Sequence, residues 1–372
     1  MSKTVLITGG AGFVGSHTAD VLLQRGYNVR IFDNLSPQVH CGGLPDYIPA
    51  AAEFVQGQLA DFDSLCRVVD GVDGILHLAA AVGVGQSMYE IASYTADNVQ
   101  GTANLLQAIL KTAPPLTKLV VASSMSIYGE GQAICPKCGP VAPSVRDLSA
   151  LKQKQWELQC AACGETLTPT ATPEDKPLQC SSIYALSKKA QEEMVLLFGN
   201  TYGIPSIALR YFNIYGPRQS LSNPYTGVAA IFASRLLNHQ PPVIFEDGQQ
   251  TRDFVNVHDV ARANLLALES TVAAGIALNI GSGTPVSIQQ VGSEIARMLG
   301  SRISPCIRNQ YRVGDIRHCF ADISRASETL GYRPSVSFRD GMGELVAWLT
   351  SQRAEDRIEE AMEHLTTRGL VA

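Results

Sequence analysis

Short apolar runs alternate with amphipathic segments along the first 125 residues of the chain. The runs predict strands at Val5–Ile7, Val29–Phe32, Phe54–Val55, Ile75–Leu78 and Leu119–Ala122, and the segments between them predict helices over 13–25, 61–69 and 95–111. Short apolar strands that alternate with amphipathic helices are typical of a parallel sheet covered on both faces. The sequence therefore predicts an α/β fold built on a doubly wound, Rossmann-like parallel sheet.

The alternation stops at about residue 130. Residues 131–178 are rich in Pro, Cys, Gln and Thr and show no sustained period, so they predict an insertion. Regular structure resumes with a helix from Tyr184 to about Tyr202 and a strand at Ile207–Leu209.

The last 22 residues, from Ser351, predict an exposed charged helix. Its apolar residues Ile358, Met362 and Leu365 lie on one face. We expect this tail to pack on the body of the protein or on a partner subunit.

The composition is that of an ordinary globular protein, with 45% hydrophobic and 17% charged residues among 372 and a net charge of −5. A negative balance argues against a protein that binds the phosphate backbone of nucleic acids. No apolar stretch is long enough to cross a bilayer, and Met1–Gly10 is typical of a first strand rather than a signal peptide. We therefore expect a cytoplasmic protein with reduced cysteines and no nucleic-acid or membrane partner.

Three glycines follow the first predicted strand at a spacing that suits a dinucleotide: Gly9, Gly12 and Gly15. Glycine permits a tight turn and lets backbone N–H groups approach a pyrophosphate at the helix N-terminus. Asp33 ends the second strand, where a carboxylate accepts hydrogen bonds from ribose hydroxyls and repels a 2′-phosphate. A glycine-rich turn alone is often only a turn, but in this context it predicts a site for NAD rather than NADP.

Tyr184 and Lys188 are the candidate acid–base pair. Of the twelve tyrosines only Tyr184 has a lysine four residues later, which puts both side chains on one helix face. A nearby ammonium stabilises phenolate, so we expect the pKa of Tyr184 to fall from about 10 toward neutrality. The phenolate can then take a proton from an alcohol while hydride leaves for nicotinamide. Ser124, at the end of the strand that precedes the insertion, belongs to the sheet edge where open α/β sheets bind ligands.

Two Cys-x-x-Cys-Gly turns lie within the insertion, one formed by Cys135 and Cys138 and the other by Cys160 and Cys163. Two such turns facing each other supply four thiolates to a tetrahedral Zn²⁺. Four protein ligands leave no open position, so we expect a structural zinc that supplies folding energy to a short polar segment. The alternative is a loop of reduced thiols without a metal. Because the insertion lies between Ser124 and Tyr184, we expect it to act as a rigid lid or an oligomer contact.

With these motifs the sequence resembles the extended short-chain dehydrogenase/reductase family, in its epimerase/dehydratase branch. The resemblance covers nearly the whole chain apart from residues 131–178 and the tail. The matching stretches are Thr8–His17, His77–Ala80, Asn98, Ser123–Gly129, Tyr184–Lys188, Arg210–Pro217 and Arg252–Asp259. The resemblance implies a tightly held NAD, a nucleotide-sugar substrate and a homodimer formed through the helices over about 95–111 and 184–202.

The resemblance also implies a role for each matching residue. Tyr184 would be the acid and base, Ser124 would hydrogen-bond the reacting sugar hydroxyl, and Lys188 would hold the nicotinamide ribose. The residues implied to contact NAD are Gly9, Gly12, Phe13, Val14, Gly15, Asp33, Asn34, Gln58, Leu59, Leu78, Ala79, Ala80, Asn98, Tyr184 and Lys188. Those implied to contact the substrate are Ser124, Ser126, Asn213, Val228, Phe245, Arg252, Arg312 and Asp315.

Within the substrate set, Asn213 would face the diphosphate, Arg252 and Arg312 would bind phosphate, Asp315 would hold the nucleotide ribose and Phe245 would lie on the base. One departure concerns adenine. Where the family usually has Asp, this chain has Gln58, whose carbonyl can still accept from the adenine amino group.

The residues after Ser124 distinguish the reactions of this family. Dehydratases carry Asp-Glu there, and the related decarboxylases usually keep the Glu, whereas this chain has Met125 and Ser126. Neither is a strong acid or base near pH 7, which leaves an epimerisation that needs only Tyr, Ser and NAD.

The resemblance favours 4-epimerisation of dTDP-L-rhamnose to dTDP-6-deoxy-L-talose. A UDP-hexose or UDP-uronate 4-epimerase is the alternative, followed by a net NAD-dependent sugar oxidoreductase. A non-catalytic NAD-binding scaffold is the remote alternative.

We expect four parts in the chain. The NAD-binding Rossmann domain is formed by 1–130, 179–211 and 250–280, and the zinc-ribbon insertion by 131–178. The nucleotide-sugar lobe is formed by 212–249 and 281–349, and the helical tail by 350–372.

Overall fold

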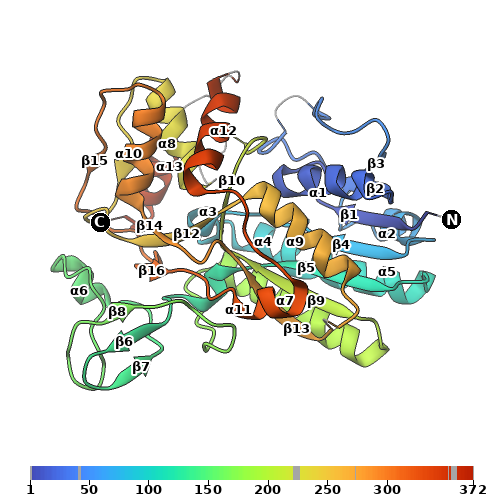
Figure 1. Ribbon diagram of the computed structural model, residues 1–372, viewed down its shortest axis with the longest axis horizontal. Coiled ribbons are helices and arrows are strands. Elements are labelled where there is room, and N and C mark those ends of the chain that lie inside the picture. The colour runs from blue at the N-terminus through green and yellow to red at the C-terminus, as the bar shows by residue number, and fades with distance from the viewer. Residues whose placement is uncertain are drawn as a thin grey trace.

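A parallel sheet of seven strands forms the centre of the protein in the computed structural model, which describes residues 2–40, 43–220, 227–272, 274–350, 352 and 358–371. In spatial order the strands are β13 (Ile276–Ile280), β9 (Ser206–Tyr211), β5 (Lys118–Ser124), β4 (Gly74–His77), β1 (Thr4–Thr8), β2 (Asn28–Asp33) and β3 (Glu53–Gln56). Every neighbouring pair is parallel, so the carboxyl ends of all the strands lie at one edge of the sheet (Figure 1).

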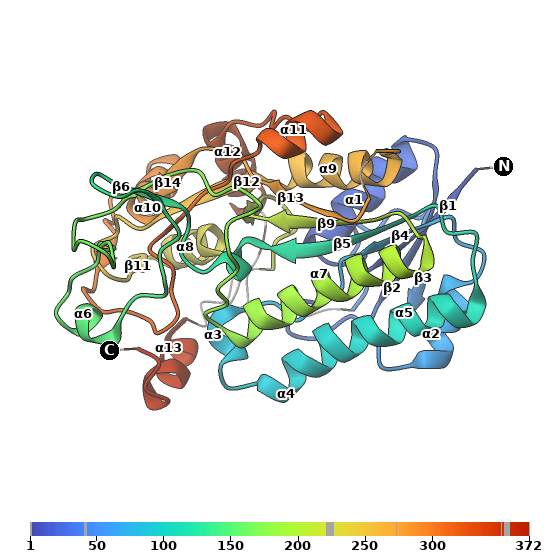
Figure 2. The ribbon, with the colours of Figure 1, turned by 90° about the horizontal axis from the view of Figure 1, so that it is seen from below.

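Helices cover both faces of this sheet (Figure 2). One face carries α1 (Phe13–Gln24), α9 (Val257–Glu269) and α11 (Ser324–Leu330), and the other carries α2 (Phe62–Val69), α5 (Gly101–Thr112) and α7 (Ile183–Tyr202). Successive strand residues point to opposite faces, so Val5 and Ile7 belong to the first core and Leu6 to the second. Both faces are therefore buried, and the predicted doubly wound α/β fold is confirmed.

The helix predicted over 95–111 does not run evenly along its length. It follows the short helices α3 (Val84–Ser87) and α4 (Ile91–Tyr94), and it opens with a π-helical segment, η1 (Thr95–Gln100), that leads into α5. A π turn is wider than an α turn and often marks a functional site. The apolar period of the sequence does not reveal it.

A second lobe is formed by segments that alternate in the chain with the last elements of the main sheet. Its small sheet contains β10 (Asn213–Tyr215), β12 (Thr251–Asn256), β14 (Pro285–Ser287) and β16 (His318–Cys319), and a separate pair is formed by β11 (Val243–Ile244) and β15 (Cys306–Ile307). Three helices, α8 (Val228–Leu237), α10 (Ile288–Met298) and α12 (Phe338–Thr350), share one apolar core with this lobe. No helix in the described ranges is long and apolar enough to span a membrane.

The insertion forms a small antiparallel ribbon beyond the edge of the main sheet (Figure 1). The chain leaves β5 through the 3-10 turn η2 (Met125–Tyr128) and builds β6 (Ala133–Cys135), β7 (Gly139–Val141), α6 (Leu148–Lys152) and β8 (Thr168–Pro169). The two outer strands pair antiparallel with β6. The buried core of this ribbon consists of Ala133, Cys135, Cys160 and Leu167, so half of it is cysteine.

The tail packs on the body of the chain, one of the two arrangements that the sequence allows. In α13 (Ile358–Thr367) the Leu365 side chain is 5% exposed. The guanidinium of Arg368 lies 4.4 Å from the Tyr89 ring centroid, and Val371 forms a β-bridge with Arg312. The tail therefore touches both the helix-rich segment near α3 and the second lobe.

Candidate active site

The glycine turn between β1 and α1 has the geometry of a phosphate cradle. Gly12 is the N-cap of α1 and has no side chain to accept from the helix, so the backbone N–H groups of the first turn are left for a ligand. Gly9 has a φ of +69°, and a Cβ there would lie 2.8 Å from the Cα of Ala79. A Cβ on Gly15 would lie 2.3 Å from the Gly9 carbonyl oxygen. These backbones approach so closely that only glycine fits, which suits a bound dinucleotide.

Asp33 lies at the end of β2, 8% exposed, beside this turn. Its carboxylate accepts the N–H groups of Ala11 at 3.0 Å and Leu35 at 2.9 Å. An ionised carboxylate has about four acceptor sites, so two are left for ribose hydroxyls. The ring of His40 lies 3.8 Å away from Asp33 Oδ1, a neighbour that nothing in the sequence pattern indicated.

Asn98 is placed where it orders the loop after β4. Its amide accepts from the Ala81 N–H at 2.7 Å, and donates to the Ala81 carbonyl at 3.1 Å and to the Ser187 hydroxyl at 2.9 Å. The side chain is fully buried. Asn98 therefore fixes the loop that contains Leu78, Ala79 and Ala80 through its own hydrogen bonds, rather than offering free donors to a cofactor.

The remaining predicted cofactor residues are spread around the same edge. Phe13 and Val14 are half-buried at the start of α1, and Asn34 is exposed, with its carbonyl accepting the Ser36 N–H at 3.0 Å. Leu59 is 9% exposed and packs against α5, whereas Gln58 is exposed. The Gln58 side chain is thus free to reach an adenine from the surface.

Ser124 and Tyr184 meet at the carboxyl edge of the sheet. Ser124 is the last residue of β5, and its hydroxyl accepts the Ser126 N–H at 3.2 Å and the Ser126 hydroxyl at 2.9 Å. Tyr184 lies in the first turn of α7, close enough to Ser124 for the serine hydroxyl to stabilise its phenolate. Ser182 caps this helix by accepting the Ala185 N–H at 3.1 Å. The structure therefore brings the two hydroxyls together from segments 60 residues apart in the chain.

Burial is the largest influence on the pKa values of Tyr184 and Lys188. It raises the pKa of Tyr184, and the hydrogen bond from Ser124 opposes that rise. Burial also lowers the pKa of Lys188 to about 7, while the Glu192 carboxylate opposes the fall. The expected drop in the Tyr184 pKa is therefore not found here. The i to i+4 spacing identifies the helix face on which Lys188 lies but not how deeply its ammonium group is buried. A lysine that is only about half protonated stabilises a phenolate weakly.

Lys188 ends in a buried network that the sequence did not reveal. Its Nζ donates to Gln191 Oε1 at 2.7 Å, and Gln191 Nε2 donates to Thr102 Oγ1 at 2.8 Å. Thr102 Oγ1 lies 2.9 Å from His77 Nε2, and the other ring nitrogen lies 2.8 Å from Thr8 Oγ1. Burial and Lys188 lower the pKa of His77 to about 3, so the ring is neutral. The network ties α7 to α5, β4 and β1.

A buried ion pair fixes α7 against the sheet. Arg210 in β9 lies 2.6 Å from the carboxylate of Glu192, one helical turn after Lys188, and both side chains are less than 10% exposed. The Ser123 hydroxyl also donates to Glu192, at 2.5 Å. These contacts fix α7, which carries Tyr184, relative to β5, which ends at Ser124.

Three predicted substrate residues come together in the second lobe, but they bond one another. The Arg312 guanidinium lies 4.8 Å from the Phe245 ring centroid, and its Nε donates to the Asp315 carboxylate at 2.8 Å. One face of the Phe245 ring is therefore covered by Arg312. Both side chains of the Arg312–Asp315 pair remain partly exposed, so a ligand can reach them.

Arg252 is engaged by backbone carbonyls. It donates to the carbonyl oxygens of Thr251 at 2.8 Å and Arg317 at 3.1 Å, and to that of Ile316. These bonds hold the segment after Asp315 against β12. The structure thus assigns Arg252 a packing task in addition to the phosphate contact expected of it.

Asn213 and Val228 complete the predicted set. Asn213 Oδ1 is buried without a hydrogen-bond partner in the described parts of the chain, as expected of an acceptor that binds a ligand. Val228 begins α8 after Gly227, an N-cap without a side-chain hydrogen bond. The motif that precedes it includes residues 221–226, which lie outside the described residues.

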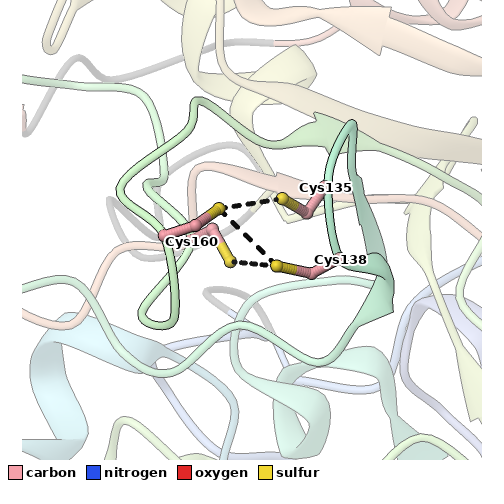
Figure 3. Close-up of side chains that lie close together, drawn as sticks. Cys135, Cys138 and Cys160 are labelled. Atoms are coloured by element: carbon pink, nitrogen blue, oxygen red, sulfur yellow. Dashed lines mark hydrogen bonds between the residues drawn. The ribbon is translucent and has the colours of Figure 1, made fainter.

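The four cysteines of the insertion form one cluster (Figure 3). Their sulfurs all lie within 4.8 Å of one another, with contacts of 3.4 Å for Cys135–Cys163, 3.6 Å for Cys138–Cys163 and 3.8 Å for Cys138–Cys160. A tetrahedron of sulfurs about 2.3 Å from Zn²⁺ has an edge of about 3.8 Å. The cluster therefore fits a tetrahedral zinc.

Comparison with known proteins is consistent with this geometry. The NAD dependent epimerase/dehydratase family matches residues 5–146 and 160–281. A dTDP-L-rhamnose 4-epimerase of Burkholderia thailandensis is 34% identical over 354 residues, 94% of this chain and 96% of that protein. The structure of a UDP-glucose 4-epimerase of Thermotoga maritima with UDP-glucose matches with a TM-score of 0.77 at 30% identity, covering 94% of this chain and 99% of that one. A UDP-glucuronic acid 4-epimerase of Bacillus cereus in complex with UDP-glucuronic acid and NAD matches with a TM-score of 0.77 at 27% identity and the same coverages.

Replacing Gly15 with Ala is expected to abolish the cofactor site. The added Cβ would lie 2.3 Å from the Gly9 oxygen and 2.6 Å from the Gly10 Cα, so the turn must open. We expect NAD binding to weaken by more than about 100-fold, about 2.7 kcal/mol, in calorimetric titrations. The control is Gly343→Ala in α12, where the added Cβ meets nothing within 4 Å. Wild-type NAD content in the Gly15→Ala protein would contradict the assignment.

Proposed function

The chain belongs to the NAD-dependent epimerase/dehydratase family, and from that membership we propose that it is a nucleotide-sugar 4-epimerase with tightly bound NAD. The observation that carries the proposal is that Ser124 and Tyr184 lie together at the carboxyl edge of the sheet, and that Met125 and Ser126 directly follow Ser124. Both following residues are buried, at 8% and 6% exposed, and neither carries a carboxyl group for elimination.

The residues of the site divide the work of a C4 epimerisation. When bound, NAD supplies the hydride acceptor and donor that the reaction needs. In its phenolate form Tyr184 takes the proton of the C4 hydroxyl and later returns it, and Ser124 orients that hydroxyl through a hydrogen bond of its own to the sugar. Lys188, whose pKa is lowered to about 7 by burial, exchanges protons easily near neutral pH and can accompany these transfers.

We propose dTDP-L-rhamnose as the substrate, converted to dTDP-6-deoxy-L-talose. The proposal is supported by the relative of that activity from Burkholderia thailandensis, which the chain matches over nearly its whole length. A UDP-hexose or UDP-uronate is the second candidate, because the two similar solved structures are 4-epimerases of UDP-glucose and UDP-glucuronic acid. Asn213, Arg312 and Asp315 are the proposed contacts to the nucleotide diphosphate in either case.

The reaction is tested with dTDP-L-rhamnose, UDP-glucose and UDP-glucuronate in separate incubations of the purified chain without added NAD. Chromatography of the products is expected to show a new epimer from one of them, with no net change of absorbance at 340 nm, because the hydride is returned in each cycle. A lasting rise at 340 nm would indicate a net oxidoreductase instead. No turnover of any sugar, even with NAD added, would count against the epimerase.

Tyr184→Phe is expected to lower kcat by about 10²–10⁴-fold, the usual contribution of a positioned acid–base group. The matched control is Tyr202→Phe, which removes an exposed hydroxyl at the other end of the same helix. Both proteins should retain NAD, so the measurement is the rate of epimer formation at saturating substrate. Equal rates would remove Tyr184 from the reaction.

We also propose that the cysteine cluster holds one structural Zn²⁺, supported by the sulfur spacing and by the small core of the ribbon. The double variant Cys135→Ser, Cys160→Ser is expected to lose the metal, because a hydroxyl is a poor zinc ligand. Mass spectrometry of the native protein should find about one zinc per wild-type chain. Cys306→Ser, an exposed thiol outside the cluster, is the control. Zinc-free wild-type protein purified with zinc present would refute the site.

A homodimer through α5 and α7 is a further proposal, supported by exposed apolar side chains on these adjacent helices. Leu186 and Leu197 are 54% and 68% exposed, and Leu197 follows Leu186 by eleven residues, about three turns, so both lie on one face of α7. Leu110 of α5 is 46% exposed.

Leu197→Glu is expected to convert the dimer to monomers in sedimentation experiments, because a carboxylate at a dry interface lacks a partner. Leu148→Glu is the control, since Leu148 is 47% exposed in α6, away from these helices. A monomeric wild type would end this proposal.

A further inference from the structure

The insertion packs against the segment that carries Arg312 and Asp315. Leu151 and Trp156 of the insertion share an apolar cluster with Tyr311 and Val313, the two neighbours of Arg312. Leu151, Trp156 and Tyr311 are 4%, 8% and 5% exposed. The residues on either side of a proposed nucleotide contact are therefore covered by the insertion.

Glu157 makes a second, ionic contact with the same segment. One of its carboxylate oxygens accepts from Arg317 Nε at 3.0 Å, and the other lies 3.0 Å from His318 Nε2. Arg317 is fully buried and also contacts the carboxylates of Glu246 at 3.0 Å and Asp247 at 2.7 Å. A buried guanidinium is costly without paired charges, so the insertion supplies part of what Arg317 needs.

Arg146 adds a third contact from the insertion. Its side chain is 5% exposed, and its Nη2 donates to the Glu246 carboxylate at 2.7 Å and to the carbonyl of Asp315 at 2.9 Å. Its Nε lies 3.1 Å from the Glu130 carboxylate. Arg146 thus joins the insertion to the backbone of Asp315 itself.

The folded shape of the insertion depends on the cysteine cluster. Cys135 and Cys160 are half of its buried core, and Glu157 precedes Cys160 by three residues. The match to the family skips residues 147–159, the stretch that contains α6, Trp156 and Glu157. The apolar contact and the Glu157 contact are therefore additions of this chain to the part that the family shares.

We propose that the four-cysteine insertion is a clamp on the nucleotide-binding segment, so that a metal held by the cysteines and a nucleoside diphosphate bound at Arg312 and Asp315 strengthen each other's binding. Glu157 and Trp156 are the positioning residues of this clamp. Loss of the metal unfolds the ribbon, withdraws Glu157 from Arg317 and uncovers Tyr311 and Val313, which loosens the segment. Since coupling between two binding sites is reciprocal, the nucleotide also retains the metal. The clamp rests on the proposed nucleotide-sugar function.

The test compares Glu157→Gln with Glu165→Gln in the full chain with its NAD. The two carboxylates belong to the same ribbon and are similarly exposed, at 41% and 38%, but Glu165 pairs with the ribbon's own Lys137. Calorimetry with UDP and dTDP is expected to give a Kd about tenfold higher in Glu157→Gln and unchanged in Glu165→Gln. Both variants should keep zinc and NAD, and kcat of Glu157→Gln at saturating nucleotide sugar should stay near that of wild type while KM rises.

Metal release gives the reciprocal measurement. Excess UDP or dTDP should slow zinc transfer to a chelator in wild type and have a weaker effect in Glu157→Gln, and the Cys135→Ser, Cys160→Ser protein should bind nucleotide about tenfold more weakly with its NAD retained. Equal nucleotide affinities in all these proteins would overturn the clamp and leave the epimerase intact. If wild type binds neither nucleotide and forms no epimer, the proposed function falls and takes the clamp with it.

Discussion

The ion pair of Arg210 and Glu192 is the contact on which the arrangement of the proposed catalytic residues depends. Glu192 lies on α7 one turn after Lys188, and it receives both Arg210 of β9 and the hydroxyl of Ser123 in β5. Removal of one partner would leave a buried charge without compensation, at about 3–5 kcal/mol. Because Ser123 adjoins Ser124 in β5 and Glu192 lies on the helix that carries Tyr184 and Lys188, these contacts fix the position of α7 relative to the end of β5.

The same ion pair explains how a large insertion is accommodated between Ser124 and Tyr184. The returning chain is fixed before it reaches α7, since Arg210 donates to the carbonyl of Glu174 at 2.8 Å and the Glu174 carboxylate accepts the N–H of Asn279 at 2.8 Å. Asn279 also donates to the Thr172 carbonyl at 2.9 Å. The returning residues are therefore bound to buried side chains, and the ribbon before them can vary without moving Ser124 and Tyr184.

The parts of the fold that follow from local rules could be predicted from the sequence. Apolar runs placed the strands, the glycine spacing placed the turn at Gly9 and Gly15, and the i to i+4 spacing placed Tyr184 and Lys188 on one face of α7. The clustering of the four cysteines could also be predicted, because each Cys-x-x-Cys turn brings two sulfurs together and a tetrahedral site needs two such turns.

Properties that depend on distant contacts could not be predicted in this way. The pKa of Lys188 depends on burial by segments far away in the chain, and the Gln191–Thr102–His77 network joins three elements with no common motif. Arg252 was expected to bind phosphate, yet two of the carbonyls that engage it, those of Ile316 and Arg317, come from a separate stretch of the sequence. The π turn that seats Asn98 leaves no periodic signal because it is a single turn.

The two binding regions are stabilised by different physics, and this difference suits an enzyme that keeps its cofactor and exchanges its substrate. The cofactor edge belongs to a sheet with an apolar core on each face, and the neutral hydrogen-bond network around His77 lies inside it. Opening that region requires the loss of much buried apolar area, so its local stability approaches that of the whole fold. The segment of Arg312 and Asp315 is held instead by ion pairs, by the small apolar cluster around Tyr311, and by a ribbon with a four-residue core. Regions with few buried apolar contacts open at lower free energy, so we expect the segment of Arg312 and Asp315 to open more readily than the edge of the main sheet that carries the glycine turn.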